Sequence, residues 1–157
     1  MSIERARNYL KEYGLDKDIM EFDVSSATVA MAAQALNCKE AEIAKTLSFM
    51  VNDEPILIVA AGDCKVDNSK FKSEFCTKAK MLSFEVVEEL IGHAVGGVCP
   101  FGVNEGVKIY LDASLKSHEA IYPACGSSNS AIKLTPEKLE AITKYEKWVD
   151  VCKSTQA

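Results

Sequence analysis

The sequence predicts an α+β fold, in which a mixed, strongly curved β-sheet is flanked by helices. Apolar positions switch between helical and strand-like spacing along the chain, without the strict strand–helix rhythm of a doubly wound parallel sheet. With 48% hydrophobic and 26% charged residues, the composition is that of an ordinary globular protein. The 157 residues contain no convincing linker, repeat or low-complexity tract, so we expect a single domain over residues 1–157.

The N-terminal region predicts helices around one short strand. A first helix begins after a cap residue, Ser2, has apolar residues on one face and ends just before Gly14. The following elements are a strand over 18–23, an alanine-rich helix from a cap at Ser26 or Thr28 to Ala35, and a short helix over 39–44.

The middle of the chain predicts a β-hairpin. Residues 45–51 read as a strand, and residues 52–55 (Asn-Asp-Glu-Pro) have turn chemistry. Residues 56–61 form a continuous apolar run, which is typical of a strand buried on both faces. Asp67 can then cap a lysine-rich helix over 68–75.

The C-terminal half alternates short strands and helices. Ser83 begins a helix that ends at Gly92 and turns Phe84, Val87, Leu90 and Ile91 inward. Strands are predicted at 79–82, 107–111, 119–124 and 130–134, with polar turns over 112–116 and 125–129. Thr135-Pro136-Glu137 opens a last helix, and residues 148–151 form a terminal edge strand.

Charge and hydropathy exclude several classes of protein. The net charge of −5 is not that of a protein that wraps a DNA duplex. No apolar run approaches the roughly 20 residues that a membrane span requires, and the N-terminus has no apolar signal-peptide core. We therefore expect a cytoplasmic protein without DNA or a membrane as partner. The segment 65–80 carries a local charge of +3, from five lysines against Asp67 and Glu74.

The six cysteines are scattered, with no Cys-x-x-Cys pair, and the chain has only two histidines. Zinc sites usually show closely spaced ligand pairs, so we expect neither a metal nor another cofactor. Free, buried thiols are the expected state of these cysteines.

The segment Gly96-Gly97-Val98-Cys99-Pro100-Phe101-Gly102 is the main candidate for a functional loop. Glycine allows another molecule to approach the main chain closely, and such a loop can direct several N–H groups at one anion or oxyanion. Lys45, at the start of a predicted strand, is the natural cation to lie opposite it. Taken by itself, the pattern favours a simple connecting turn, because Gly- and Pro-rich loops are common.

Two residues in or just before this loop, His93 and Cys99, are candidate reactive groups. His93 is a candidate general base, although a residue that caps the helix end or points to solvent fits the sequence better. Cys99 is a candidate nucleophile if a histidine lies beside it. The alternative, a small residue that fills the loop, is favoured.

Four segments, in this order, resemble one known family: Lys45-Thr46-Leu47, Ala61-Gly62-Asp63-x-Lys65-Val66-Asp67, the Gly96–Gly102 loop, and Gly126-Ser127 ahead of Leu134-Thr135-Pro136-Glu137-Lys138-Leu139. Over residues 2–151 the chain is similar to the YbaK / prolyl-tRNA synthetase-associated family of editing domains. The strand lysine and the Gly-x-x-x-Pro loop from Gly96 to Pro100 are the most specific marks.

The resemblance implies a barrel-like sheet and a pocket that takes the ester of a mischarged aminoacyl-tRNA. It implies that Lys45 contacts the 3′-terminal nucleotide or the ester, and that the loop amides hold the ester, a water or the oxyanion. The catalytic residues it implies are Lys45, Gly96, Gly97, Val98, Cys99 and Pro100. The substrate-binding residues it implies are Thr46, Asp63, Lys65, Phe101, Gly102, Gly126 and Ser127.

We therefore expect a trans-acting aminoacyl-tRNA deacylase. Its partners are the acceptor end of a mischarged tRNA, near the Lys65–Lys80 segment, and an aminoacyl-tRNA synthetase that adds affinity. An aminoacyl ester is already activated, so positioning and charge stabilisation suffice without a catalytic triad. The alternatives are a non-catalytic module that binds a nucleotide, an RNA end or a synthetase in the same pocket, and a cysteine-dependent enzyme that uses Cys99.

Overall fold

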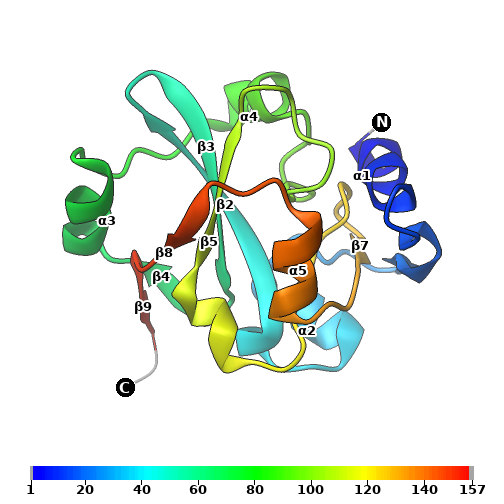
Figure 1. Ribbon diagram of the computed structural model, residues 1–157. Coiled ribbons are helices and arrows are strands. Elements are labelled where there is room, and N and C mark those ends of the chain that lie inside the picture. Colours follow the sequence, from blue (N-terminus) through cyan, green and yellow to red (C-terminus); the bar gives the residue numbers. More distant parts are fainter. Residues whose placement is uncertain (1, 156–157) are drawn as a thin grey trace.

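A five-stranded mixed sheet lies at the centre of the computed structural model, which describes residues 2–155 (Figure 1). Antiparallel pairing joins β2 to β3, whereas β2–β6, β3–β5 and β5–β8 are parallel pairs. The sheet curls into a half-barrel, as predicted. In sheet order its strands are β6 (Tyr122–Pro123), β2 (Ile43–Val51), β3 (Glu54–Ala61), β5 (Lys108–Asp112) and β8 (Lys147–Val149).

Two small antiparallel pairs flank this sheet. One joins β1 (Met20–Glu21) to β7 (Ser130–Ala131), and the other joins β4 (Cys64–Val66) to β9 (Cys152–Ser154). The first pair holds the segment before α2 next to the 126–131 turn, which is where the candidate site lies.

Five α-helices cover the sheet over the described residues: α1 (Ser2–Lys11), α2 (Val29–Leu36), α3 (Asn68–Phe75), α4 (Phe84–Ile91) and α5 (Pro136–Ile142). Three short 3₁₀ helices join them: η1 (Asp16–Asp18), η2 (Glu40–Glu42) and η3 (Ala113–Ser117). In Figure 1, α3 and α1 lie on opposite sides of the sheet. None of the helices within residues 2–155 is long and apolar enough to cross a membrane.

The predicted helix caps are confirmed where the structure describes them. The side chains of Thr28, Asp67 and Thr135 each accept a hydrogen bond from the N–H three residues on, which satisfies a donor that the helix cannot. Gly92 ends α4 with a φ of +103°. The side chain of Ser2, the other predicted cap, lies outside those that the structure describes.

Two hydrophobic clusters fill the two faces of the sheet. The larger packs α1, α4 and α5 on residues such as Leu57 and Val59 of β3. The smaller packs α3 through Phe71 on Phe49 and Ile58. The continuous apolar run of β3 is therefore buried on both faces, as its sequence predicts.

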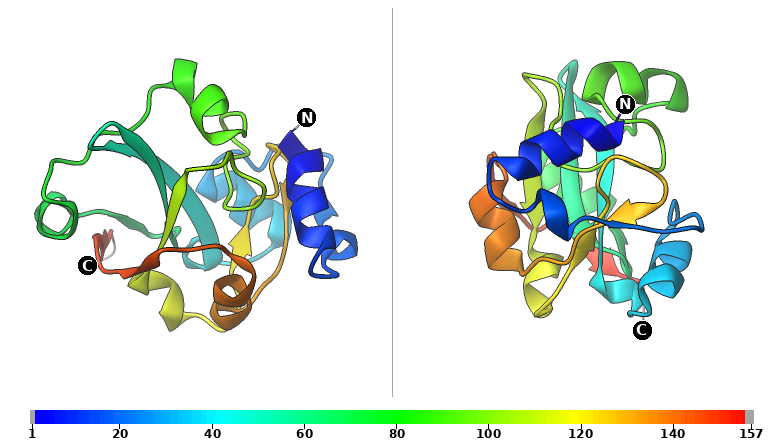
Figure 2. Two further views of the ribbon diagram at one scale, coloured as in Figure 1. Left: turned by 45° about the horizontal axis from the view of Figure 1, so that its top comes forward. Right: turned by 90° about the vertical axis from the view of Figure 1, so that its right-hand side faces the viewer.

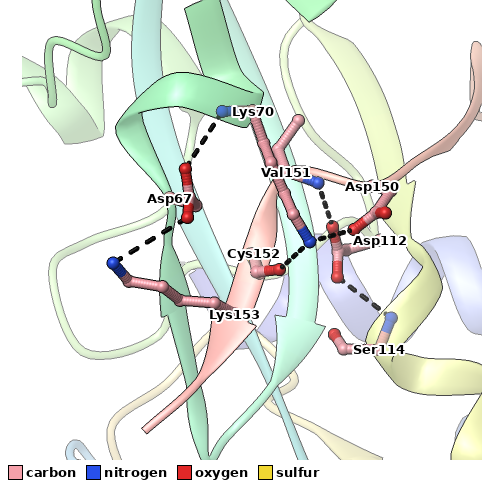
Figure 3. Close-up of polar contacts among 8 residues, drawn as sticks. All are labelled: Asp67, Lys70, Asp112, Ser114, Asp150, Val151, Cys152 and Lys153. Atoms are coloured by element: carbon pink, nitrogen blue, oxygen red, sulfur yellow. Dashed lines mark hydrogen bonds and ion pairs between the residues drawn. The ribbon is translucent and has the colours of Figure 1, made fainter.

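A buried carboxylate ties the C-terminal segment to the end of β5. Asp112 is only 1% exposed, and its two oxygens accept hydrogen bonds from the N–H groups of Val151 at 2.9 Å and Ser114 at 3.0 Å. Figure 3 shows this carboxylate beside the Lys70 side chain, which bonds Asp150 and the carbonyl oxygen of Cys152.

Several strand predictions are too long. Residues 79–82 contribute only a bridge between Met81 and Phe49, and the strands predicted at 119–124 and 130–134 shrink to β6 and β7. Pro123 has no N–H to continue a ladder. The hairpin turn is tighter than predicted, because Val51 already pairs with Glu54.

The prediction that Phe84 turns inward is wrong: its side chain is 78% exposed. Val87 and Ile91 do face the core, as predicted. Phe84 is the first residue of α4, which begins beyond the edge of the core.

Candidate functional site

A cavity of about 220 Å³ lies beside β2, where α2, α4 and the loop after α4 meet (the β2 cavity). Much of its wall is apolar, from residues such as Ala44, Val87, Val98 and Ala131. A mostly apolar wall with a few polar groups is the usual character of a small-ligand site. The polar side chains on the wall belong to Ser26, Thr28, Lys45, Thr46, Ser48, Tyr122 and Ser130.

Four of the sequence-predicted site residues line this cavity: Lys45, Thr46, Gly96 and Val98. The strand lysine and the glycine loop, which are about fifty residues apart in sequence, thus border one space. This juxtaposition is what distinguishes a candidate site from a connecting turn.

Buried polar contacts on the side away from solvent hold the glycine loop in place. The Nε2 atom of His93 lies 2.6 Å from the carbonyl oxygen of Phe101, and the N–H of Gly97 donates to the carbonyl oxygen of Ala94 at 3.0 Å. The Gly97 amide is therefore used inside the loop. Phe101 itself is fully buried and packs on Tyr9 of α1.

Helix α1 braces the same loop from the other side (Figure 2). The guanidinium of Arg5 bonds the carbonyl oxygen of Gly92 and the Asn104 side chain. A Cβ on Gly102, whose φ is +71°, would stand 2.6 Å from the carbonyl oxygen of Arg5. Gly102 is therefore required by packing against α1, and it does not line the β2 cavity.

The glycine loop packs main chain to main chain on the Gly-Ser turn. A Cβ on Gly97 would lie 2.6 Å from both the carbonyl carbon of Gly126 and the amide nitrogen of Ser127. Only glycine permits this approach. Gly126 and Ser127 thus support the loop from behind, and the Ser127 hydroxyl bonds that of Ser130 on the cavity wall at 2.7 Å.

The ammonium of Lys45 is bound by main-chain carbonyl groups. Nζ donates to the carbonyl oxygens of Gly62, at 3.4 Å, and of Cys64. Gly62 lies in the turn between β3 and β4 and Cys64 is the first residue of β4, so the ammonium of this cavity-lining lysine is anchored where β4 begins. Carbonyl oxygens orient an ammonium without neutralising it.

Thr46 presents an unusual polar group at the cavity wall. Its Oγ1 is buried, and within residues 2–155 it has no hydrogen-bond partner. Buried polar atoms without partners are uncommon in native structures and call for an explanation. Because Thr46 lines the cavity, this buried hydroxyl lies at the candidate site.

His93 and Cys99 lie in contact, which the sequence did not reveal. The distance from Cys99 Sγ to His93 Nε2 is 3.5 Å, and both side chains are fully buried. The expectation that His93 caps the helix end or points to solvent is wrong. Because a carbonyl oxygen can only accept a hydrogen bond, the proton lies on His93 Nε2, which donates to the carbonyl oxygen of Phe101. The other ring nitrogen, Nδ1, is buried without a hydrogen-bond partner among the described residues.

The electrostatics of this pair favour uncharged groups. Burial lowers the pKa of His93 and raises the pKa of the Cys99 thiol to about 12. A nucleophilic cysteine needs an accessible thiolate, and Cys99 offers neither access nor charge. The pair therefore fills the base of the loop.

The remaining predicted site residues lie away from the cavity. Asp63 and Lys65 lie on either side of Cys64, whose carbonyl oxygen binds the Lys45 ammonium, and Lys65 is exposed on β4. Pro100 is buried beside Phe101 in the loop. Over the described residues, no group of three His, Cys, Asp or Glu side chains is placed to hold a metal ion.

Sequence reasoning missed the side chains that complete the cavity wall, such as Ser48, Tyr122 and Ser130. Strand alternation was the available signal for Ser48, since it shares a strand face with Thr46. The pairing of β1 with β7 places Ser130 at the cavity, and the pairing of β2 with β6 places Tyr122 there. No local sequence pattern specifies either pairing.

Comparisons with known proteins identify the family. The profile of the aminoacyl-tRNA editing domain matches residues 24–142. An uncharacterized protein, YwhH, of Bacillus subtilis (strain 168) is 47% identical over 98% of both chains. The proline–tRNA ligase of Listeria welshimeri is 25% identical over 86% of this chain, which spans only 24% of that longer enzyme.

A solved structure of a candidate trans-editing enzyme for prolyl tRNA synthetase superposes with a TM-score of 0.86 at 28% identity and covers 98% of each chain. The hypothetical protein APE2540 superposes with a TM-score of 0.84 at 27% identity, over 95% of this chain and 99% of the other. The profile match spans the strand lysine and the glycine loop, which border the β2 cavity, and the Gly-Ser turn that packs behind this loop. The chain belongs to the aminoacyl-tRNA editing domain family.

Proposed function

We propose that this protein is a trans-acting deacylase that hydrolyses the ester of mischarged aminoacyl-tRNA and so acts in translation quality control. The observation that carries the proposal is the β2 cavity, bordered by the Lys45 strand and the Gly96–Pro100 loop. Its volume of about 220 Å³ suits an aminoacyl group and excludes a folded RNA. The similarity to a candidate trans-editing enzyme supports action on a tRNA that a separate synthetase has charged.

In the proposed reaction, an oxygen nucleophile attacks the ester carbonyl carbon. This oxygen comes from a water or from a hydroxyl on the aminoacyl side chain itself. The attacking oxygen loses a proton, the bond to the ribose oxygen breaks, and the ribose oxygen takes up a proton. With water the products are the free amino acid and the tRNA, and with the side-chain hydroxyl they are a lactone and the tRNA. Main-chain amides at Gly96 and Val98, on the cavity wall, would stabilise the oxyanion that forms on the carbonyl.

Lys45 would position the substrate through charge. Its ammonium is held by two uncharged carbonyl groups and sits on a flexible stem. Because carbonyl groups do not cancel its charge, the ammonium would swing from Gly62 and Cys64 toward the cavity to attract the 3′-terminal nucleotide or the ester. No covalent enzyme intermediate is required, which agrees with the burial of Cys99.

Partner binding would compensate for the acidic surface. A net charge of −5 gives little general attraction for a polyanion. We propose that contact is confined to the acceptor end, and that a synthetase supplies further affinity. Recovery of neither tRNA nor a synthetase in a pull-down of the tagged protein would refute this part. The cytoplasm, where these partners occur, is the proposed location.

The test is hydrolysis of a panel of mischarged tRNAs by purified protein. The wild type should hydrolyse at least one of them, and Lys45→Ala should lower kcat/KM about 100-fold while circular dichroism stays unchanged. Lys108→Ala is the matched control, because Lys108 also lies on a strand of the central sheet but pairs with Glu54 at the surface. Equal rates for Lys45→Ala and the wild type would refute the assignment.

The alternative, a non-catalytic binding module, shares the same cavity. It gains support only if the protein binds the acceptor end and hydrolyses no ester in the panel. The cysteine-dependent alternative predicts that Cys99→Ala abolishes turnover, whereas the deacylase proposed here predicts that most activity survives.

A further inference from the structure

An exposed apolar rim surrounds part of the β2 cavity. Met81, Phe84 and Val95 all line the cavity, and their exposed fractions are 60%, 78% and 48%. Three of the six large hydrophobic side chains that stand out as exposed among the described residues therefore gather at one opening. Scattered exposed hydrophobic residues need no explanation, but a cluster at a ligand site does.

Phe84 is the most exposed member of this rim. It lies at the start of α4, three residues before the buried Val87, and helical spacing would allow it to turn toward the core. Its ring instead remains open to solvent at the edge of the cavity. An aromatic face in this position is suited to stack on another planar group.

The proposed substrate fixes what that group would be. In an aminoacyl-tRNA the ester and the terminal base are attached to the same ribose. If the aminoacyl group occupies the cavity, the terminal base must therefore lie at the opening, within reach of the rim. Base–aromatic stacking is the usual way in which proteins hold unpaired nucleotides.

Charge indicates the path of the next nucleotides. On one side of the rim, the exposed Lys78 and Lys80 lie within three residues before Met81. On the other side, three exposed carboxylates follow Phe84 along α4: Glu85, Glu88 and Glu89. Phosphate groups would be attracted on the lysine side and repelled along the helix. The strand would therefore leave the rim toward the segment 78–80.

Resting on the proposed function, we propose that Phe84, with Met81 and Val95, is the platform on which the terminal base of the tRNA acceptor end stacks. Phe84 is then a substrate-binding residue outside the predicted site set. This assignment requires that binding depend on the base itself and on an aromatic ring at position 84.

The test uses the trinucleotide CCA and its analogue that lacks the 3′-terminal base. Phe84→Ala should weaken binding of CCA about tenfold, a typical loss for one stacked base, and should leave binding of the abasic analogue unchanged. Phe84→Trp should restore the affinity for CCA.

Fluorescence of the Phe84→Trp variant gives a second readout. CCA should quench the new indole and the abasic analogue should not, whereas the signal of Trp148, the one tryptophan of the unmodified chain, should stay constant. Val24→Ala is the control, because Val24 is 60% exposed but does not line the cavity.

The outcomes separate this inference from the deacylase proposal. Unchanged CCA binding by Phe84→Ala, with ester hydrolysis intact, would overturn the platform and leave the deacylase standing. Base-dependent binding without hydrolysis of any ester would support the platform and refute the deacylase. If Phe84→Ala impairs only the capture of a synthetase, the rim is a protein interface and the platform is wrong.

Discussion

Adjacent residues on β2 play different roles because successive strand side chains point to opposite faces. Lys45 pairs with Ala60 and sends its ammonium to the carbonyl oxygens of Gly62 and Cys64, whereas the Thr46 hydroxyl has no partner within residues 2–155. The sequence predicts the strand and its lysine. It does not reveal the carbonyl partners, because only the folded sheet brings Gly62 and Cys64 near Lys45.

Thr46→Val separates function from stability at the cavity wall. The valine keeps the shape of threonine and removes a buried hydroxyl that has no partner, so the free energy of unfolding should stay equal or rise. If the hydroxyl binds substrate, kcat/KM for ester hydrolysis should fall about tenfold. Denaturant unfolding and single-turnover kinetics on the same preparation measure both. A variant with full activity would remove Thr46 from the substrate-binding set.

His93 gives a pH dependence with a definite sign. Burial lowers the pKa of His93 below that of the unfolded chain, which is about 6.5. Below about pH 6.5, His93 is protonated in the unfolded state but stays neutral in the folded state until the pH reaches its lower folded-state pKa. The free energy of unfolding therefore falls as the pH drops through this range. Above it both states are neutral, and this residue contributes no slope.

We expect His93→Gln to flatten the stability profile between pH 7 and pH 5. Urea denaturation of the wild type and the variant across this range is the measurement. Carboxylates whose pKa is lowered, such as Glu140, act in a more acidic window, because their contribution is lost only as they become protonated. An identical slope in His93→Gln would contradict the buried, neutral assignment.

At the scale of elements, the close approach of the glycine loop to the Gly-Ser turn forms the back of the site. A Cβ at Gly97 would meet the main chain of Gly126 and Ser127 at 2.6 Å. The motif itself was evident in the sequence. The reason why position 97 needs glycine was not evident. The sequence suggested that a ligand approaches the main chain there, whereas the structure shows that another part of the chain does so.

Gly97→Ala should therefore destabilise the fold and impair catalysis together. Moving two main-chain segments apart should cost about 2 kcal/mol or more, and the displaced loop should lower kcat. Gly106→Ala is the control: its φ is +91° and nothing lies within 4 Å of the added Cβ, so it should cost about 1 kcal/mol in strain and leave kcat unchanged. Equal effects of the two substitutions on stability and kcat would contradict the packing argument.

The junction of β5 with the C-terminal segment depends on Asp112 (Figure 3). Asp112→Ala removes the acceptor for two N–H groups, of which that of Val151 is buried, and should cost about 3 kcal/mol. Asp150→Ala removes only an exposed ion pair with Lys70 and should cost less than about 1 kcal/mol. Chemical denaturation measures both, and a small loss for Asp112→Ala would show that the carboxylate does not fasten this junction.

At the scale of the whole molecule, sequence reasoning succeeded where the signal is local. The β2–β3 hairpin, the caps at Asp67 and Thr135 and the stop at Gly92 follow from spacing and turn chemistry. It failed where pairing is long-range: the three-residue strands β4 and β9 are too short for a periodic pattern and lie almost ninety residues apart. Tyr122 and Ser130 also reach the candidate site through long-range pairing.

In the proposed function the β2 cavity receives the aminoacyl end of a tRNA. The most direct test is an NMR titration of ¹⁵N-labelled protein with a non-hydrolysable 3′-aminoacylamino-adenosine, which keeps the carbonyl and replaces the ester oxygen by N–H. The backbone amides of Thr46, Gly96 and Val98 should show the largest shift changes. Changes confined to the lysines around α3, or none at these three amides under saturating ligand, would contradict the assignment of the cavity.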